Sequence, residues 1–223
     1  MRKLITIVSA LALLAGAASA AETSGPETYD LLFKGSTLDD LALDQQLIYD
    51  RIVQNGIKPE TQERDTGKIV LSFADGQVPE ALLRFSRDDK YRNIGTFPAS
   101  VGNPIIMYFV ETVVRDMAET AGGSPYYIRN RVKEALIQPA DVSKGQAIIA
   151  GETVETVDVT LRPFKGDPNA DRMQGFDELA MTVSMSDDAP GWYLVLAAHV
   201  PGADDGDPLY SSVMTFDHTE TAQ

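Results

Sequence analysis

The chain has 223 residues, with 19 basic and 33 acidic side chains, two histidines and no cysteine, and its formal net charge at pH 7 is −14. This acidity disfavours nucleic acid and anionic membrane surfaces as partners, because both select clustered lysine and arginine. The absence of cysteine excludes a disulfide framework and a thiol nucleophile. Stability must therefore come from an ordinary apolar core, which a chain of this length can bury.

The first 20 residues have the pattern of a secretory signal peptide. Arg2 and Lys3 precede an apolar run over residues 4–14, and small residues follow up to Ala20 as a cleavage pattern. The run is shorter than the roughly 20 residues of a membrane-spanning helix, and an uncleaved anchor is the alternative. We expect a single mature domain, residues 21–223, with a net charge of −16 and no stable membrane span. It would lie in the periplasm of a Gram-negative bacterium or be secreted from it.

The first part of the mature chain predicts a short helix followed by strands. Ser24 is typical of a helix start and Gly35 of a helix end, so the segment between them is expected to be helical. Apolar residues then alternate, which predicts strands over residues 45–53, 68–73 and 81–85. The first of these strands carries apolar side chains on both faces, so we expect it to be covered on both sides.

Residues 103–138 differ from the rest of the chain because their apolar side chains recur at intervals of three and four. Pro104 and Pro125 each stand where a helix begins, and Gly122 and Pro139 each stand where a helix ends. The segment therefore predicts a pair of helices joined by a short turn, with a wide apolar face on the first helix and a narrower one on the second.

The second half of the chain alternates in the way that antiparallel strands do. We expect a hairpin over residues 146–161, another over residues 179–200 and a last strand over residues 209–216. In the second hairpin the alternation places five side chains on the same face: Trp192, Leu194, Leu196, Ala198 and Val200. With about eight or nine strands, the predicted fold class is α+β: a curved antiparallel sheet, or half-barrel, that covers the inserted helical hairpin.

A helical hairpin in the concavity of a curved sheet either fills it or leaves a pocket. If it fills the space, its apolar stripe is ordinary core; if it does not, the gap can take a hydrophobic molecule. Methionine and aromatic side chains on these faces favour a pocket only modestly, since methionine also fills cores. The expected pocket residues are Phe109, Val113, Met117, Tyr127, Met181, Met185, Trp192 and Leu194.

The order of signal peptide, antiparallel strands, mid-chain helices and further strands resembles the LolA/LolB-type periplasmic carriers and related half-barrel proteins. The resemblance covers most of the mature chain in the order of its elements, and it carries over no motif and no functional residue. It implies a curved sheet that wraps around helices and accommodates an acyl chain, and thus a carrier or chaperone for a lipid-like ligand. The alternative is a non-enzymatic envelope protein with a fully packed core and a protein partner.

Little in the sequence indicates an enzyme or a cofactor. The histidines are His199, on an expected strand, and His218, near the C-terminus, and no G-x-S-x-G elbow, phosphate loop or zinc spacing accompanies them. A triad around His199 would need partners from distant parts of the chain, so an ordinary hydrogen-bonded or solvated histidine is the simpler interpretation. We expect no cofactor, and no catalytic residue is assigned.

One segment partly matches a calcium-binding loop. The first, third, fifth and twelfth positions of an EF-hand loop, which supply ligands, would be Asp167, Asn169, Asp171 and Glu178. Arg172, however, replaces the glycine of the sixth position, and the flanking segments predict strands instead of helices. A polar loop is the alternative to a metal site.

Basic residues gather on the expected helical pair although the chain as a whole is acidic. Arg129 and Lys133 stand four apart and so share one side of the second helix. They are candidates for contact with an anionic group of a ligand or with the acidic surface of a partner. Salt bridges to neighbouring acidic side chains are the alternative.

Overall fold

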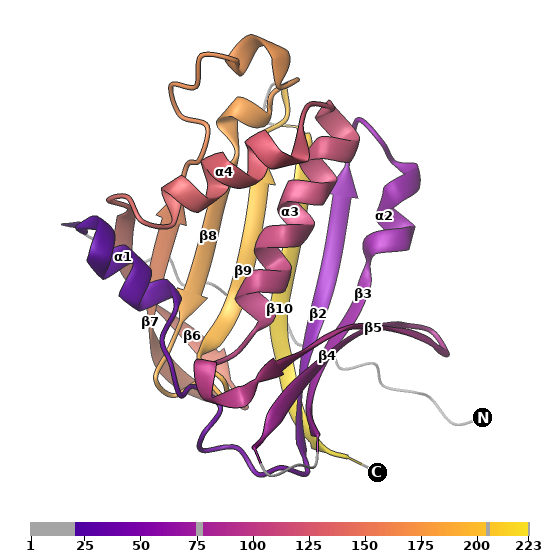
Figure 1. The fold of residues 1–223 in the computed structure, drawn as a ribbon, viewed down its shortest axis with the longest axis vertical. Coiled ribbons are helices and arrows are strands. Elements are labelled where there is room, and N and C mark those ends of the chain that lie inside the picture. The colour runs from indigo at the N-terminus through magenta and orange to yellow at the C-terminus, as the bar shows by residue number, and fades with distance from the viewer. Residues whose placement is uncertain (1–20, 75–77, 204–205, 223) are drawn as a thin grey trace.

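The computed structural model describes residues 21–74, 78–203 and 206–222. The predicted signal peptide, residues 1–20, lies outside the described residues. Within them the chain is α+β, as predicted: one open, curved antiparallel sheet with helices packed on one face (Figure 1).

Ten strands form the sheet in the order β1-β6-β7-β8-β9-β10-β2-β3-β4-β5, and every neighbouring pair is antiparallel. The two edges, β1 and β5, are not paired with each other, so the barrel does not close. The strands are β1 (Ala21–Glu22), β2 (Gln45–Asn55), β3 (Gly67–Ala74), β4 (Glu80–Arg87), β5 (Lys90–Pro98), β6 (Asp141–Ile149), β7 (Glu152–Leu161), β8 (Ala180–Met185), β9 (Tyr193–Val200) and β10 (Tyr210–Thr221).

Four α-helices occur in the described residues: α1 (Gly25–Leu32), α2 (Glu60–Asp65), α3 (Ile105–Ala121) and α4 (Pro125–Ala135), with short 3₁₀ turns η1 (Ala99–Val101), η2 (Ala170–Arg172) and η3 (Phe176–Glu178). The predicted helical pair is confirmed as α3 and α4, and both lie over the same face of the sheet, the inner face (Figure 1). The strand β5 and the short helix α2 were not anticipated from the sequence. None of the helices in the described part of the chain is long and apolar enough to cross a membrane.

The sheet and α3 build the main core because their apolar stripes face each other. Leu47 and Tyr49 on β2 and Phe109 on α3 are fully buried in one apolar cluster. The expectation that β2 is covered on both sides holds only in part: Ile48 is buried, but Ile52 on the outer face is 59% exposed. None of the described helices covers this face, so the second apolar stripe of β2 partly meets solvent.

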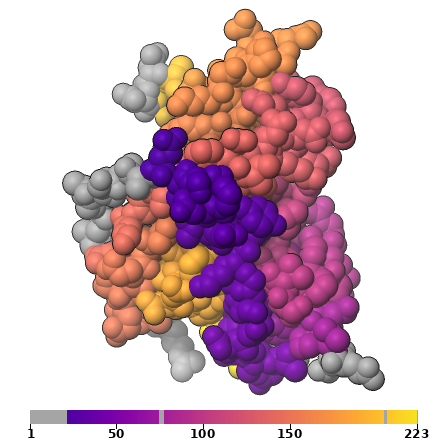
Figure 2. All heavy atoms as spheres, turned by 60° about the vertical axis from the view of Figure 1, so that its left-hand side comes forward, coloured from indigo at the N-terminus to yellow at the C-terminus, as the bar shows by residue number. Residues whose placement is uncertain are grey.

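An N-terminal strap closes the inner face from the side. Residues 24–44, in indigo, run across the flank of the molecule between the strands and α3 (Figure 2). The backbone oxygen of Leu32 accepts a hydrogen bond from Tyr193 Oη at 2.6 Å, and that of Leu31 accepts one from Trp192 Nε1 at 3.1 Å. A side chain at Gly25 would collide with the carbonyl oxygen of Ile137, so the strap fits closely against the end of α4. The strap thus seals the seam between sheet and helices.

One prediction of side-chain direction is wrong, and a β-bulge is the reason. Met185 pairs with Tyr193 and Ser184 with Val195, so Leu194 is an extra residue on β9. A bulge reverses the alternation beyond it. Leu194 therefore does not share a face with Leu196 as predicted: it packs in a separate cluster with Ala147, Val154 and Ala189, whereas Leu196 belongs to the main core.

Candidate functional site

The residues predicted to line a hydrophobic pocket are mostly packed in the core. On α3, Phe109 and Val113 are fully buried and Met117 is 2% exposed. Met181, Met185 and Trp192 are buried in the same apolar cluster. The four cavities described for this structure are lined by other residues, with Leu194 as the one exception. A lipid-like ligand between sheet and helices stays a prediction, and it would require these side chains to separate.

Tyr127, the remaining pocket candidate, lies on α4 and contacts the segment that partly matched a calcium loop. Its hydroxyl donates to the buried carboxylate of Asp167, 2.8 Å from each oxygen, and Arg131 Nε donates to Asp167 Oδ2 at 2.8 Å. The backbone N–H of Asn169 is 2.8 Å from Asp167 Oδ1. Asp167 therefore ties its loop to α4, and no group of three or more histidine, aspartate or glutamate side chains gathers as metal ligands in the described residues.

The other candidates on the helices and strands have ordinary surroundings. Arg129 forms a bidentate contact with Glu111, with Nη2 2.8 Å from Oε2, which confirms the salt-bridge alternative for that residue. Lys133 is exposed, and no ion pair of this residue is present in the described part of the chain. His199 is also exposed, on the outer face opposite Ser211.

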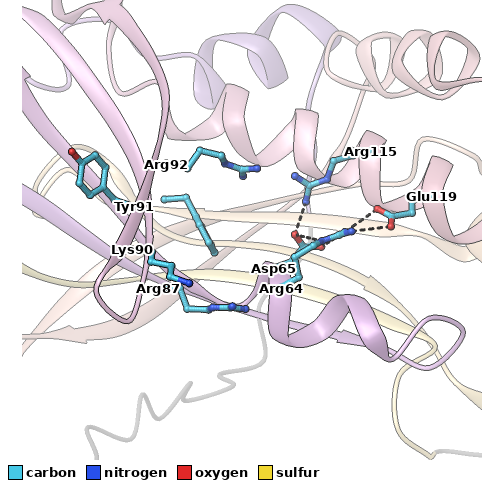
Figure 3. Close-up of a pocket in the computed structure, with 9 residues that line it drawn as sticks. Arg64, Asp65, Arg87, Lys90, Tyr91, Arg92, Arg115 and Glu119 are labelled. Carbon is cyan, nitrogen blue, oxygen red and sulfur yellow. Dashed lines mark hydrogen bonds and ion pairs between the residues drawn. The ribbon is translucent and has the colours of Figure 1, made fainter.

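A cluster of positive charge lies elsewhere, in a cleft of about 430 Å³ between the β4–β5 hairpin and the helices α2 and α3 (Figure 3). We call it the cationic pocket. Five basic and two acidic side chains line it together with two aromatic rings: Arg64, Arg87, Lys90, Arg92, Arg115, Asp65, Glu119, Phe85 and Tyr91. A net positive lining is unusual for a chain whose net charge is −14.

The hairpin wall of the pocket follows from strand pairing. Phe85 pairs with Arg92, and Arg87 with Lys90, and paired residues of antiparallel strands project from the same face. Figure 3 accordingly shows the side chains of Arg87, Lys90 and Arg92 directed toward the helices, whereas Tyr91 points away. Arg92 lies over the Phe85 ring, 5.6 Å from its centroid. Lys90 and Arg92 form no ion pair within the described residues.

The helical wall is held by a chain of alternating charges that begins in the core. Arg51, 1% exposed, donates from Nη2 to Asp116 Oδ2 at 2.8 Å, and the hydroxyl of Tyr210 donates to the same oxygen at 2.8 Å. The other oxygen of Asp116 accepts from Arg115 Nη2 at 2.7 Å. Burial of an ion pair is costly unless its remaining hydrogen-bonding groups are satisfied, and here both carboxylate oxygens have partners.

The chain of charges continues to the surface of the pocket. Arg115 Nη2 lies 3.2 Å from Asp65 Oδ1, and Arg64 Nη2 lies 2.7 Å from Asp65 Oδ2. Arg64 also makes a bidentate contact with Glu119, at 3.0 and 2.8 Å. These contacts fix the two guanidinium groups in position. Arg115 uses Nε and Nη2 for them, and its Nη1 makes no hydrogen bond among the described residues.

Both acidic side chains of the pocket stay ionised at neutral pH. Burial by itself would raise the pKa of Asp65, but the hydrogen bond from Arg64 and the charges of three arginines outweigh it, so the pKa is lowered. The hydrogen bond from Arg64 also lowers the pKa of Glu119. The pocket therefore keeps five positive and two negative charges, which suits an anionic group of a ligand.

The sequence contains only weak signals for this pocket. Arg115 is one of several basic residues on the helical pair, whereas Arg64, Arg87, Lys90 and Arg92 lie on other elements, and none of the five was predicted as a site residue. The run RDDKYR, residues 87–92, has an Asp-Asp turn that would have placed Arg87 opposite Lys90 in a hairpin. The approach of this hairpin to α2 and α3 depends on the curvature of the sheet, and no local sequence pattern indicates it.

Comparison of the sequence with models of known protein families found no match, and comparison with curated proteins found none either. Functional inference for this chain therefore rests on the chemistry of its own residues.

Proposed function

We propose that this protein is a non-enzymatic binding protein that works outside the cytoplasm and holds an anionic group of its ligand in the cationic pocket. The observation that carries the proposal is the excess of five basic over two acidic side chains in one cleft of an acidic chain. The extracytoplasmic location is supported by the signal-peptide pattern of residues 1–20.

The geometry of the pocket favours binding over catalysis. Its lining contains no serine, threonine, cysteine or histidine, so no nucleophile with an adjacent base is available among these residues. Lys90 and Arg92 can contact a ligand without first breaking an ion pair with a described residue. Arg64 and Arg115 are already oriented by carboxylates, and pre-oriented donors lose less side-chain entropy on binding.

The size of the pocket indicates more than a bare inorganic ion. A cleft of about 430 Å³ falls within the range of small-molecule sites. The half-buried ring of Phe85 lines the pocket and provides an apolar surface beside these cations. A small organic molecule with one or more carboxylate, phosphate or sulfate groups fits this combination.

The test is calorimetric titration of the mature protein with citrate, inorganic phosphate and sulfate, with glucose as an uncharged control. We expect saturable binding of at least one anion, weakened with added salt because exposed charges are screened. The double variant Lys90→Ala/Arg92→Ala should weaken binding by about tenfold or more, since hydrogen bonds to charged groups contribute about 1.5–3 kcal/mol each.

Lys133→Ala is the matched control, because Lys133 is an exposed cation that does not line the cationic pocket. Its affinity for the anion should equal that of the unaltered protein. If no anion binds saturably, the proposal is wrong. If Lys133→Ala weakens binding as much as the double variant does, the anion has no preference for the cationic pocket, and the cationic pocket is not the site.

A further inference from the structure

A second cavity lies on the outer face of the sheet, which carries none of the helices in the described residues. The tip of the β6–β7 hairpin packs there through Ala147 and Val154, which are buried in one cluster with Leu194 of β9. Beside this contact is a cavity of about 450 Å³, which we call the outer pocket. Its lining comes from the hairpin and from β2, β7, β8, β9 and β10: Asp50, Ala147, Ile148, Ile149, Ala150, Gly151, Thr156, Ser184, Leu194, Val195, Thr215, Phe216 and Asp217.

Most of this lining is apolar. Leu194, Val195 and Phe216 come from the sheet, and Ile148 and Ile149 come from the hairpin. Ile148 is 44% exposed, although large apolar side chains are usually covered in a packed hairpin. The bulge in β9 is the structural cause of this surface, because it turns Leu194 away from the main core.

The two charged side chains that line the outer pocket, Asp50 and Asp217, are both acidic. Their carboxylates contact Lys68 Nζ at 2.8 and 3.2 Å, and Asp217 Oδ2 also lies 3.0 Å from His218 Nδ1. Burial would raise the pKa of Asp217, but the hydrogen bonds from Lys68 and His218 outweigh this effect and lower it, so this carboxylate stays ionised at neutral pH. Close by, Asp158 pairs across the strands with Ser184, and one of its carboxylate oxygens is buried with no hydrogen-bond partner among the described residues.

We infer that the outer pocket binds a small amphipathic molecule with an apolar chain and a cationic head group. The chain would lie against Leu194, Val195 and Phe216, and the head would meet the carboxylates of Asp50 and Asp217. The ring of Phe216 supports this choice, since an aromatic face also attracts an organic cation. The volume of about 450 Å³ suits a single small molecule. This inference does not depend on the cationic pocket, which lies at the inner face and prefers the opposite charge.

The experiment compares octyltrimethylammonium, octyl sulfate and octyl glucoside by calorimetry below their micelle concentrations. All titrations use the Lys90→Ala/Arg92→Ala variant, so that octyl sulfate does not report the cationic pocket. We expect one octyltrimethylammonium per chain and an affinity for octyl sulfate that is at least about tenfold lower, which corresponds to about 1.4 kcal/mol. Absence of saturable binding of octyltrimethylammonium overturns the inference, and equal affinity for octyl sulfate overturns the cationic head group.

Two substitutions of exposed isoleucines locate the site. Ile148→Lys places a positive charge at the outer pocket and should weaken octyltrimethylammonium binding by about tenfold. Ile52→Lys is the matched control: Ile52 is 59% exposed on the outer face and does not line the pocket, so the affinity should not change. Equal losses in both variants would exclude this site.

Asp217→Asn tests the head group without altering the apolar walls. It should lower the affinity for octyltrimethylammonium and leave that for octyl glucoside unchanged, because only the ammonium head interacts with the charge of Asp217. An unchanged affinity for the ammonium probe would contradict the assigned role of the rim carboxylates.

Discussion

The two faces of the sheet differ in what their side chains do. The inner face carries the main apolar core, the N-terminal strap and a buried ion pair, Arg51–Asp116. Among the described residues, the outer face carries a small cluster around Leu194 and the outer pocket. The cationic pocket lies where the inner face ends, at the β4–β5 hairpin. The comparison shows that the packed inner face stabilises the fold, whereas the cavities lie at its margin and on the opposite side.

The strongest test of this difference removes the buried carboxylate of Asp116. In Asp116→Ala the guanidinium of Arg51 would be buried without a counter-charge and the hydroxyl of Tyr210 would lose its acceptor. Loss of one partner of a buried pair typically costs about 3–5 kcal/mol. We expect a decrease of that size in the free energy of unfolding, measured by urea titration. Glu111→Ala, which breaks the exposed pair with Arg129, should leave the unfolding midpoint almost unchanged.

Two leucines of β9 give a matched comparison of the faces. Leu196 is fully buried in the main core, and Leu194 is 5% exposed in the outer cluster. We expect about 4 kcal/mol of destabilisation for Leu196→Ala and about 2 kcal/mol for Leu194→Ala. The cavity that Leu194→Ala leaves lies in a small cluster near the surface, where neighbouring side chains can fill it more completely. Thermal or urea unfolding of the two variants measures the difference. A larger effect at Leu194 would mean that the outer face contributes more to the fold than its small cluster indicates.

Substitutions in the cationic pocket should separate binding from stability. Lys90 and Arg92 are exposed, so Lys90→Ala/Arg92→Ala should change the free energy of unfolding by no more than about 0.5 kcal/mol. Anion affinity should nevertheless fall by about tenfold, as described above. Urea unfolding and calorimetry on the same samples test both parts. A large loss of stability would instead assign these cations a structural role.

The smallest expected effect is that of pH. The lowered pKa values of Asp65 and Glu119 mean that both stay ionised down to well below neutral pH. The affinity for sulfate should therefore vary little between about pH 5 and pH 8, since sulfate does not titrate there either. The stability that these depressed pKa values contribute is present above the unfolded-state values of about 4 and is lost as pH falls through the folded-state values. A steep change of sulfate affinity near neutral pH would point to a different titrating group at the site.

Local sequence patterns determined the elements of this fold to a considerable extent. The alternation of β7 to β10 and the three-and-four spacing of α3 follow directly from burial on one face, which is why the curved antiparallel sheet and the helical pair were predicted correctly. The capping box of α1, in which Ser24 and Glu27 bond reciprocally, is likewise a local interaction, because its two residues are only three apart in the sequence. The periodicity of α3 showed which side chains are apolar but not whether they enclose a space.

Only the tertiary structure decided where the cavities lie. The bulge that turns Leu194 outward depends on the register between β8 and β9, and register is set by contacts that are distant in sequence. The cationic pocket likewise joins Arg64 of α2, Arg115 of α3 and Arg92 of β5, which the curvature of the sheet and the packing of the helices bring together. Periodicity describes one element at a time, whereas a binding site is made by the distances between elements, and these are fixed only when the whole core packs.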